Sequence, residues 1–369
     1  MASPTLVSLL SLPPSIEALG PANVHLLGLA MLLVLLLVLS SRLAAIHALL
    51  APQDARKQSV LDLPSMLIRK GALVAYGAYF LVLSKDKVSK KQLAKAHAAH
   101  AHGGAVEREI RLIFVRHGES TWNYVFNRGF YPSFLLRLIR TTLHELYLLP
   151  YDDSAYIDSP LSDLGLEQCA SLQRFLRQPC LEPLAQPDFA ALTQGESSSL
   201  LVSSPLRRAA ATVAIALSDR LRRSSERVAL NSSCQEISRN FDTMALAPKG
   251  AAPRLALPDP SLRLSFDAAA NAGNKSTSTP GYSRLMSFAQ WASERPESTL
   301  IIGGHSLWFR SFFQCFLPPT VDHVSKKRKI VNCGVVGLTL QVLRDYHGQL
   351  HYRVDPSSIA VVYGGFDSK

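Results

Sequence analysis

Residues 110–123 read Ile-Arg-Leu-Ile-Phe-Val-Arg-His-Gly-Glu-Ser-Thr-Trp-Asn, and this stretch decides the fold. Mostly apolar, β-favouring residues fill Ile110–Val115 and stop at Arg116, His117 and Gly118, which predicts a buried strand that delivers its last side chains to a cleft. In open α/β sheets ligands gather beyond the carboxyl ends of the strands, and a glycine there lets the backbone approach a ligand closely. The cationic pair predicts that the ligand is an anion.

Two further segments repeat the change from an apolar run to polar residues. Residues 199–212 (Ser-Leu-Leu-Val-Ser-Ser-Pro-Leu-Arg-Arg-Ala-Ala-Ala-Thr) lead into a helix whose first turn holds Arg207 and Arg208, and residues 298–310 bring His305 to the end of a strand that closes in two glycines. A phosphate at such a helix start gains guanidinium hydrogen bonds and stabilisation from the helix end. An isolated histidine or arginine pair is usually structural, but three such junctions predict one shared anion site.

These motifs together resemble the histidine phosphatase superfamily, specifically its phosphoglycerate mutase-like branch. The resemblance rests on Arg-His-Gly-Glu-Ser at 116–120 with Asn123, on the Ser-x-Leu-x-Arg-Ala pattern, whose arginine is Arg208, and on Gly-His at 304–305. It implies a three-layer α/β/α fold with a mostly parallel central sheet, and a metal-independent phosphatase that uses no cofactor. The roles it implies are catalytic for His117, Glu236 and His305, and phosphate-binding for Arg116, Arg208, Ser120 and Asn123.

The expected chemistry is phosphoryl transfer through a phosphohistidine on His117. A neutral imidazole nitrogen is a competent nucleophile near neutral pH, and a carbonyl partner on the other ring nitrogen would fix its tautomer. In the family a carboxylic acid protonates the leaving group, and Glu236 matches it by position, after a short strand expected at 228–230. The glycine-rich continuation of the family is replaced here by Arg-Asn-Phe-Asp at 239–242. Arg207, beside the phosphate-binding arginine, is expected to be a surface charge.

Two segments interrupt the family pattern and hold the expected substrate selectivity. Residues 130–149 predict a helix that serves as a lid or faces a membrane. Residues 245–281 shift to Pro, Ala, Ser, Asn and Gly, which predicts a long loop without a core of its own. The substrate is therefore open, and sugar phosphates, phosphoproteins and lipid or inositol phosphates all remain candidates.

The N-terminal part of the chain predicts a membrane anchor. Residues 24–39 form an almost unbroken apolar run that stays semi-apolar to Leu50, about the length that crosses a bilayer. A cleaved signal peptide is the alternative, although it normally starts with a basic region. The basic residues that follow place the catalytic domain in the cytoplasm by the positive-inside tendency. The expected organisation is a tail at 1–23, an anchor at 24–50, a basic juxtamembrane region with a short apolar segment and a tether at 51–104, and a catalytic domain at 105–369.

Composition agrees with a large folded domain beside a membrane surface. The chain has 369 residues, 47% of them hydrophobic, and a net charge of +11. Its basic residues cluster near the apolar segments and do not interleave with aromatics, which favours a membrane over nucleic acid as the partner. The five scattered cysteines show no metal-ligand spacing and are expected to be reduced thiols. Glycan at either sequon, Asn231 or Asn274, would place the domain in a lumen instead.

Three other functions remain open at this stage. A phosphoglycerate mutase-type phosphotransferase would need a second substrate-orienting shell, for which the segment after Glu236 offers no counterpart. A serine hydrolase would use Gly-His-Ser-Leu-Trp at 304–308, where Trp308 replaces the last glycine of the nucleophile elbow. A non-catalytic, membrane-tethered binding protein is the third.

Overall fold

The computed structural model describes residues 53–99, 104–149, 151–180, 182–195, 198–224, 226–257, 259 and 265–368. Side chains are described from Met66 onward. The predicted tail at 1–23 and the predicted anchor at 24–50 therefore lie outside the described residues.

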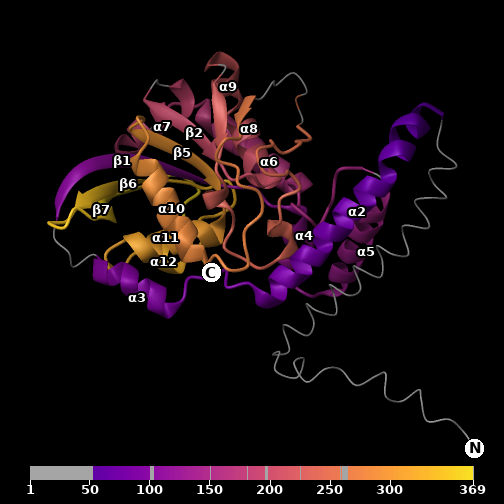
Figure 1. Cartoon of the computed structure of the whole chain (residues 1–369). Coiled ribbons are helices and arrows are strands. Elements are labelled where there is room, and N and C mark those ends of the chain that lie inside the picture. Colours follow the sequence, from indigo (N-terminus) through magenta and orange to yellow (C-terminus); the bar gives the residue numbers. More distant parts are fainter. Residues whose placement is uncertain are drawn as a thin grey trace, which may run out of the picture.

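A seven-stranded sheet of order β4-β3-β2-β5-β1-β6-β7 lies at the centre of the molecule (Figure 1). The first five strands in that order run parallel, and β6 and β7 are antiparallel to their neighbours. The predicted mostly parallel sheet is confirmed. The strands are β1 (Ala105–Arg116), β2 (Ser199–Ser203), β3 (Arg227–Leu230), β4 (Ser265–Asp267), β5 (Thr299–Gly304), β6 (Val335–Arg344) and β7 (Leu350–Tyr363).

Helices cover both faces of the sheet, because successive side chains of a strand point to opposite sides. Ile110, Leu112 and Phe114 of β1 join one apolar core with α3, α10 and α11, whereas Ile113 and Val115 join a second core with α6, α7, α8 and α9. The fold is the predicted three-layer α/β/α arrangement. The helices are α2 (Gln53–Leu83), α3 (Lys90–Ala99), α4 (Thr121–Phe126), α5 (Pro132–Tyr147), α6 (Asp163–Leu176), α7 (Gln186–Gln194), α8 (Arg207–Ala216), α9 (Ser218–Ser224), α10 (Gly281–Ser293), α11 (Ser306–Phe316) and α12 (Val324–Lys327), with 3-10 turns at Pro183–Ala185, Ser232–Cys234 and Phe241–Thr243.

Aromatic packing fixes α11 beneath β1. The Phe114 ring stacks on Phe309 at 4.4 Å between centroids and meets the edge of Phe312 at 5.3 Å. Gly304 permits this contact, since a Cβ there would lie 2.8 Å from the Phe309 ring. The start of α11, and with it His305, is thereby held against the carboxyl end of β1.

Helices α2 and α5 lie beside each other at one end of the sheet domain (Figure 1). The helix expected within 130–149 is confirmed as α5. It leaves a row of large apolar side chains exposed: Leu135, Leu136, Ile139, Leu143 and Tyr147, preceded by Phe130 and Tyr131. Met66–Leu83 of α2 is, within the described residues, the one stretch long and apolar enough to cross a membrane, and 22% of it is buried.

Two local expectations differ from the structure. The 245–281 segment contributes β4, which pairs with β3, and its first residues Ala245 and Leu246 are buried. The expected tether is partly helical, because α3 reaches Ala99. All five cysteines are free, as expected.

Candidate active site

Four neighbouring strands deliver the predicted site residues to one edge of the sheet. Strands β3, β2, β5 and β1 lie side by side in that order and are followed by Glu236, Arg208, His305 and His117 respectively. The rings of His117 and His305 lie 5.1 Å apart between centroids, at an angle of 59°. Two histidines separated by nearly two hundred residues therefore meet at a distance that one phosphate can bridge.

His117 is buried and held in one tautomer. Its Nδ1–H donates to the carbonyl of Gly118 at 2.6 Å, which leaves Nε2 with a free lone pair. Burial, and then the charges of Arg208 and Arg116, hold the pKa of His117 well below its usual range, so the ring is neutral at pH 7. The predicted carbonyl partner is thus present.

Gly118 is required by a close backbone approach. A Cβ at Gly118 would lie 2.7 Å from the carbonyl oxygen of Gly165, and one at Gly165 would lie 2.0 Å from the carbonyl oxygen of Glu119. The first turn of α6, which Ser162 caps by accepting from Gly165 N–H, therefore packs directly against the loop that follows His117. The signature glycine allows α6 to support the nucleophile.

His305 is completely buried and keeps one ring nitrogen without a partner. Its Nε2 lies 2.9 Å from Ser204 Oγ, which also accepts a hydrogen bond from Leu206 N–H. When the Ser204 hydroxyl donates to Nε2, the ring proton is on Nδ1, and Nδ1 has no partner in the described part of the chain. The partner of His305 is therefore Ser204, rather than the Ser306 that a serine hydrolase would use.

Two arginines complete a cationic pocket around the histidines. Arg116 donates from Nη1 to the Ile330 carbonyl at 2.5 Å, and Arg208 bonds Asp242 through its carbonyl at 2.6 Å and its carboxylate at 3.2 Å. The Nε atoms of both arginines are buried without a partner in the described residues, as is Nδ1 of His305. Five other arginines in the described residues also keep a buried Nε without a partner, so it is the meeting of three such nitrogens at one sheet edge that favours an anionic ligand.

Arg207 is a correction to the sequence analysis. It was expected at the surface, but its side chain is buried and donates to the carbonyls of Asp158 and Ser154 and to the carboxylate of Asp153. Its backbone N–H donates to Asp158 Oδ1. Arg207 therefore fastens the start of α8 to the 153–158 loop, and Arg208 alone faces the histidines.

Glu236 lies at the start of α11, next to His305. Its Oε1 accepts hydrogen bonds from Ile237 N–H at 3.0 Å and Trp308 N–H at 2.9 Å, and its Oε2 accepts from Leu307 N–H at 3.3 Å. The position agrees with an anion at a helix N-terminus. It places a carboxyl group beside the anion pocket.

Ser120 and Asn123 are tied into α4. Ser120 Oγ caps the helix by accepting from Asn123 N–H, and Asn123 Oδ1 accepts from Asn127. Both residues follow His117 closely on the chain, and their phosphate-binding role stays a prediction.

The sequence analysis missed several residues that shape the site. Asp242 pairs with Arg208, and its pKa is raised by burial. Lys275 donates to the carbonyls of Glu236 and Ser238 and to the buried carboxylate of Asp86. Short polar spacings could not have revealed these contacts, because Asp86 and Lys275 are nearly two hundred residues apart.

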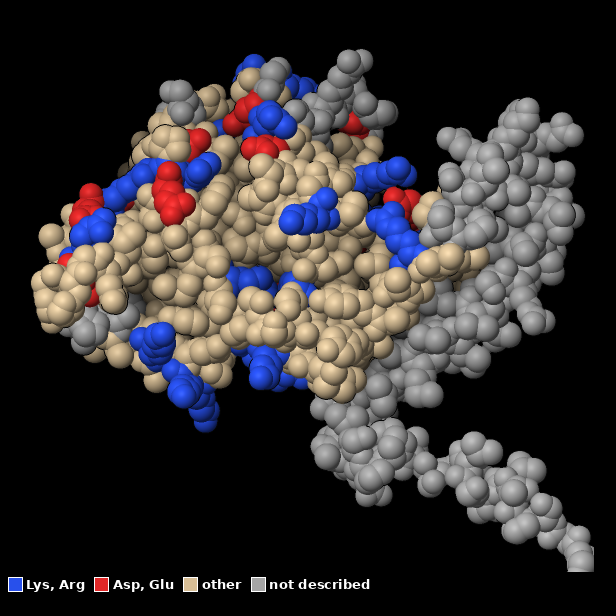
Figure 2. Space-filling model, in the orientation of Figure 1, with Lys and Arg blue, Asp and Glu red and all other residues tan. Residues whose placement is uncertain are grey.

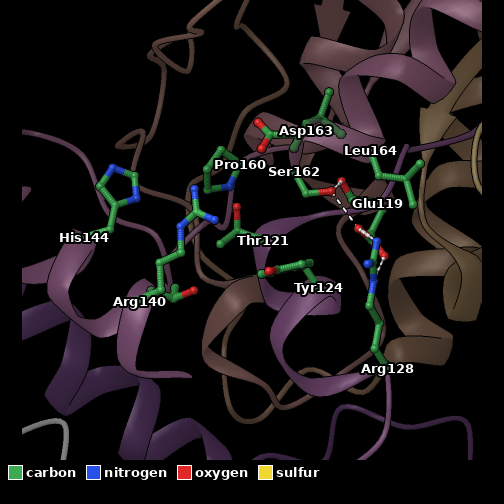
Figure 3. Close-up of a pocket in the computed structure, with 12 residues that line it drawn as sticks. Glu119, Thr121, Tyr124, Arg128, Arg140, His144, Pro160, Ser162, Asp163 and Leu164 are labelled. Carbon is green, nitrogen blue, oxygen red and sulfur yellow. Dashed lines mark hydrogen bonds and ion pairs between the residues drawn. The ribbon is translucent and has the colours of Figure 1, made fainter. Parts of the chain in front are cut away.

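A cavity of about 670 Å³ opens beside the site between α4, α5 and the start of α6 (Figure 3). Glu119 lies on its wall, where Arg128 and Ser162 bind its carboxylate. Arg140 and His144 of α5 line the side opposite Arg128. The 130–149 insertion therefore supplies one wall of a cavity that starts two residues after the nucleophile.

No group of three or more candidate metal ligands is present among the described residues. No family model and no curated protein matches the sequence. Several solved structures are similar to the chain.

A mycobacterial glucosyl-3-phosphoglycerate phosphatase in complex with VO3 is 16% identical, with a TM-score of 0.34, over 69% of this chain and 99% of its own. The ecdysone phosphate phosphatase of Bombix mori is 13% identical, with a TM-score of 0.32, over 70% of this chain and 94% of its own. The mostly parallel sheet and the two adjacent strand-end histidines agree with the resemblance described from the sequence. Because these TM-scores are below 0.5, no residue role, family membership or substrate is transferred from these structures.

Proposed function

We propose that the chain is a metal-independent phosphomonoesterase that acts through a phosphohistidine on His117. The observation that carries the proposal is the convergence of buried, unpartnered donors on two adjacent imidazoles: Arg116 Nε, Arg208 Nε and His305 Nδ1. A dianionic phosphoryl group would supply acceptors to all three. The cations and the neutral His305 would stabilise the charge that spreads over the phosphoryl oxygens during transfer.

In the first step, the lone pair of His117 Nε2 forms a bond to phosphorus while the bond from phosphorus to the leaving oxygen breaks. Protonated Glu236 gives its proton to that oxygen, so that an alcohol departs. In the second step water attacks the phosphohistidine, Glu236 takes a proton from the water, and the N–P bond breaks to release inorganic phosphate. The free Nε2 and the Nδ1–H bond to Gly118 support the first step.

Trapping of the phosphoenzyme tests this mechanism directly. The full chain is mixed with a radiolabelled phosphomonoester, quenched, and divided between acid and alkali. We expect label that survives alkali, is lost in acid, and is absent from His117→Asn. Label that is stable in acid, or that persists in His117→Asn, would contradict the assignment.

The absence of a metal requirement is tested in the same preparation. Hydrolysis is measured after exhaustive treatment with a chelator and again after addition of divalent cations. We expect equal rates, because the arginine side chains supply the positive charge. A rate that collapses with the chelator and returns with one metal would contradict metal independence.

We further propose that the protein is a single-pass membrane protein whose catalytic domain faces the cytoplasm and lies against the bilayer. The exposed apolar row of α5 and the apolar Met66–Leu83 stretch beside it support this placement. Exposed lysines at 85, 87, 90, 91 and 95 would be attracted to anionic lipid. Labelling of α5 by a photoreactive probe embedded in the lipid, compared between the full chain and a Leu135→Ser/Leu136→Ser/Leu143→Ser variant in vesicles, tests the contact of α5. Equal labelling of α5 in the two proteins would argue against that contact.

A further inference from the structure

A second cavity lies next to Glu236, since Ile237 and Leu307 line it. It has a volume of about 480 Å³ and is bounded by the end of α2, the 237–240 loop and α11. Leu307, Arg310, Ser311 and Gln314 line it from α11. Their spacing of three, four and seven residues places them on one face of the helix, so the same helix that starts at His305 and Glu236 also forms the wall of this cavity.

Two arginines in this cavity have no counter-charge. Arg239 and Arg310 each keep a buried Nε without a partner, and neither forms an ion pair with any described residue. Asp86 is the one carboxylate among the residues that line the cavity. It is already bound by Lys275 at 2.8 Å and Arg284 at 2.7 Å, so it does not neutralise the two guanidinium groups.

Lys329 adds positive charge near both groups of arginines. Burial and the charges of Arg116 and Arg310 lower the pKa of Lys329, whereas the carboxylates of Glu236 and Asp367 raise it. Three cations and two carboxylates therefore influence one another in this region.

The accessible surface also has an excess of positive over negative side chains on one side. On the face drawn in Figure 2, Lys and Arg side chains occupy the lower half of the molecule with almost no acidic side chains, whereas both signs mix in the upper half. The lower half of this view contains α3 and the place where α2 reaches the sheet domain. An anionic molecule would therefore meet positive charge along this side.

We infer that the cavity lined by Arg239 and Arg310 binds a second anionic group of the substrate while the reacting phosphoryl group lies between His117 and His305. This inference rests on the proposed phosphatase activity and narrows its substrate to compounds with a phosphomonoester and a second phosphate. A buried Nε without a partner is costly, and a phosphate accepts bidentate hydrogen bonds from a guanidinium group. The second phosphate comes from a soluble bisphosphate or from the diester of a phospholipid headgroup, and the position beside Leu81 and Val88 at the end of α2 admits both.

Binding to a catalytically silent chain tests the subsite independently of hydrolysis. The full chain with His117→Asn is titrated calorimetrically with propane-1,3-diyl bisphosphate, hexane-1,6-diyl bisphosphate and their alkyl monophosphate counterparts. We expect at least one bisphosphate to bind about tenfold more tightly than its monophosphate, and Arg310→Gln or Arg239→Gln to remove that advantage. The affinity for monophosphate should stay unchanged in both variants.

Two controls separate charge from folding. Arg254, whose side chain is 82% exposed, gives the matched variant Arg254→Gln, which should change neither affinity. Arg310→Lys keeps the charge and should keep part of the preference for the bisphosphate. A bisphosphate preference that is equal in Arg310→Gln, Arg239→Gln and Arg254→Gln would overturn the subsite.

A lipid arm distinguishes the two sources of the second phosphate. Binding to phosphatidylcholine vesicles with and without phosphatidylinositol monophosphate is measured for the same variants. If only the binding to vesicles depends on Arg310 and Arg239, the subsite takes a lipid headgroup. If only the binding of soluble ligands depends on them, it takes a free bisphosphate. Independence from both arginines in both arms would overturn it. Arg310-dependent binding to the His117→Asn chain, together with a wild-type chain that forms no phosphoenzyme, would refute the proposed hydrolysis and leave the subsite standing.

Discussion

Two buried charge clusters flank Glu236, and they differ in how completely their charges are satisfied. In the first, Asp86 binds Lys275 and Arg284, and Lys275 also donates to Glu236 O, Ser238 O and Thr243 Oγ1. Asp86 and Lys275 have partners for all their charged atoms, and Arg284 keeps only its Nε without one. In the second, Arg116, Arg208 and His305 each keep a buried nitrogen without a partner in the described residues. The first cluster has its own carboxylate between two cations, whereas the second has three unpartnered nitrogens meeting where an anion can bind.

We interpret the first cluster as structural and the second as a ligand-binding site. The satisfied cluster joins Asp86, which follows α2, to Arg284 of α10 and to the loop that carries Glu236. The unsatisfied cluster lies where four strands end. The comparison is open to four tests, which are ordered here by the size of the expected effect.

Replacement of the nucleophile should abolish activity without harming the fold. We expect His117→Asn to lower kcat by more than about 10⁴-fold, since a covalent route has no substitute for its nucleophile. Its urea midpoint should stay close to that of the wild type, because the ring makes its one described side-chain hydrogen bond to the neighbouring Gly118. Steady-state hydrolysis and urea unfolding measure the two quantities. Residual turnover near the wild-type rate would remove His117 from the mechanism.

Removal of Asp86 from the first cluster should destabilise the fold. Asp86→Ala leaves Lys275 and Arg284 buried without their carboxylate, and we expect a loss of about 3–5 kcal/mol in the free energy of unfolding. Urea denaturation measures it. The matched control is Asp322→Ala, which breaks an exposed pair with Lys327 and should cost less than about 1 kcal/mol. If Asp86→Ala were as mild as the control, the cluster would not be a structural joint.

Filling the unsatisfied cluster should stabilise the protein. Inorganic phosphate at a hundred times its dissociation constant should add about 2.7 kcal/mol to the unfolding free energy, if it binds only the folded state. Arg208→Gln should abolish this gain, and Arg254→Gln should retain it. A gain that is unchanged in Arg208→Gln would show that phosphate binds elsewhere.

The strand-end residues were predictable because each follows an apolar run in the sequence. His117, Arg208 and His305 can be recognised because each follows an abrupt change from apolar strand residues to polar residues. The topology of the sheet then brings them together. Arg207 was misplaced, since its partners in the 153–158 loop carry no local pattern that links them to α8. The roles of Asp86 and Lys275 could not be predicted either, because their ion pair depends on a tertiary contact between distant segments. Strand β4 was hidden in a polar composition typical of loops.

The smallest expected effect is the pH dependence that the two buried histidines add to stability. The pKa values of His117 and His305 are held well below their usual range by burial and by Arg208, so in the folded state both rings stay neutral as the pH falls below 6.5. The unfolded chain takes up protons there and binds more of them than the folded chain, so the unfolding free energy decreases as the pH decreases. Each histidine contributes a slope of at most about 1.4 kcal/mol per pH unit.

Urea unfolding of the wild type, of His117→Asn/His305→Asn and of His144→Asn between about pH 5 and 6.5 isolates this contribution, because other titrating groups are common to all three. His144 is exposed, so its replacement should leave the slope unchanged. The double variant should show a shallower slope than the wild type. Saturating phosphate should also flatten the wild-type slope, because a bound dianion satisfies the same donors and favours a protonated ring. Equal slopes in the wild type and the double variant would mean that the buried imidazoles do not stay neutral, which would remove the electrostatic basis for a neutral nucleophile.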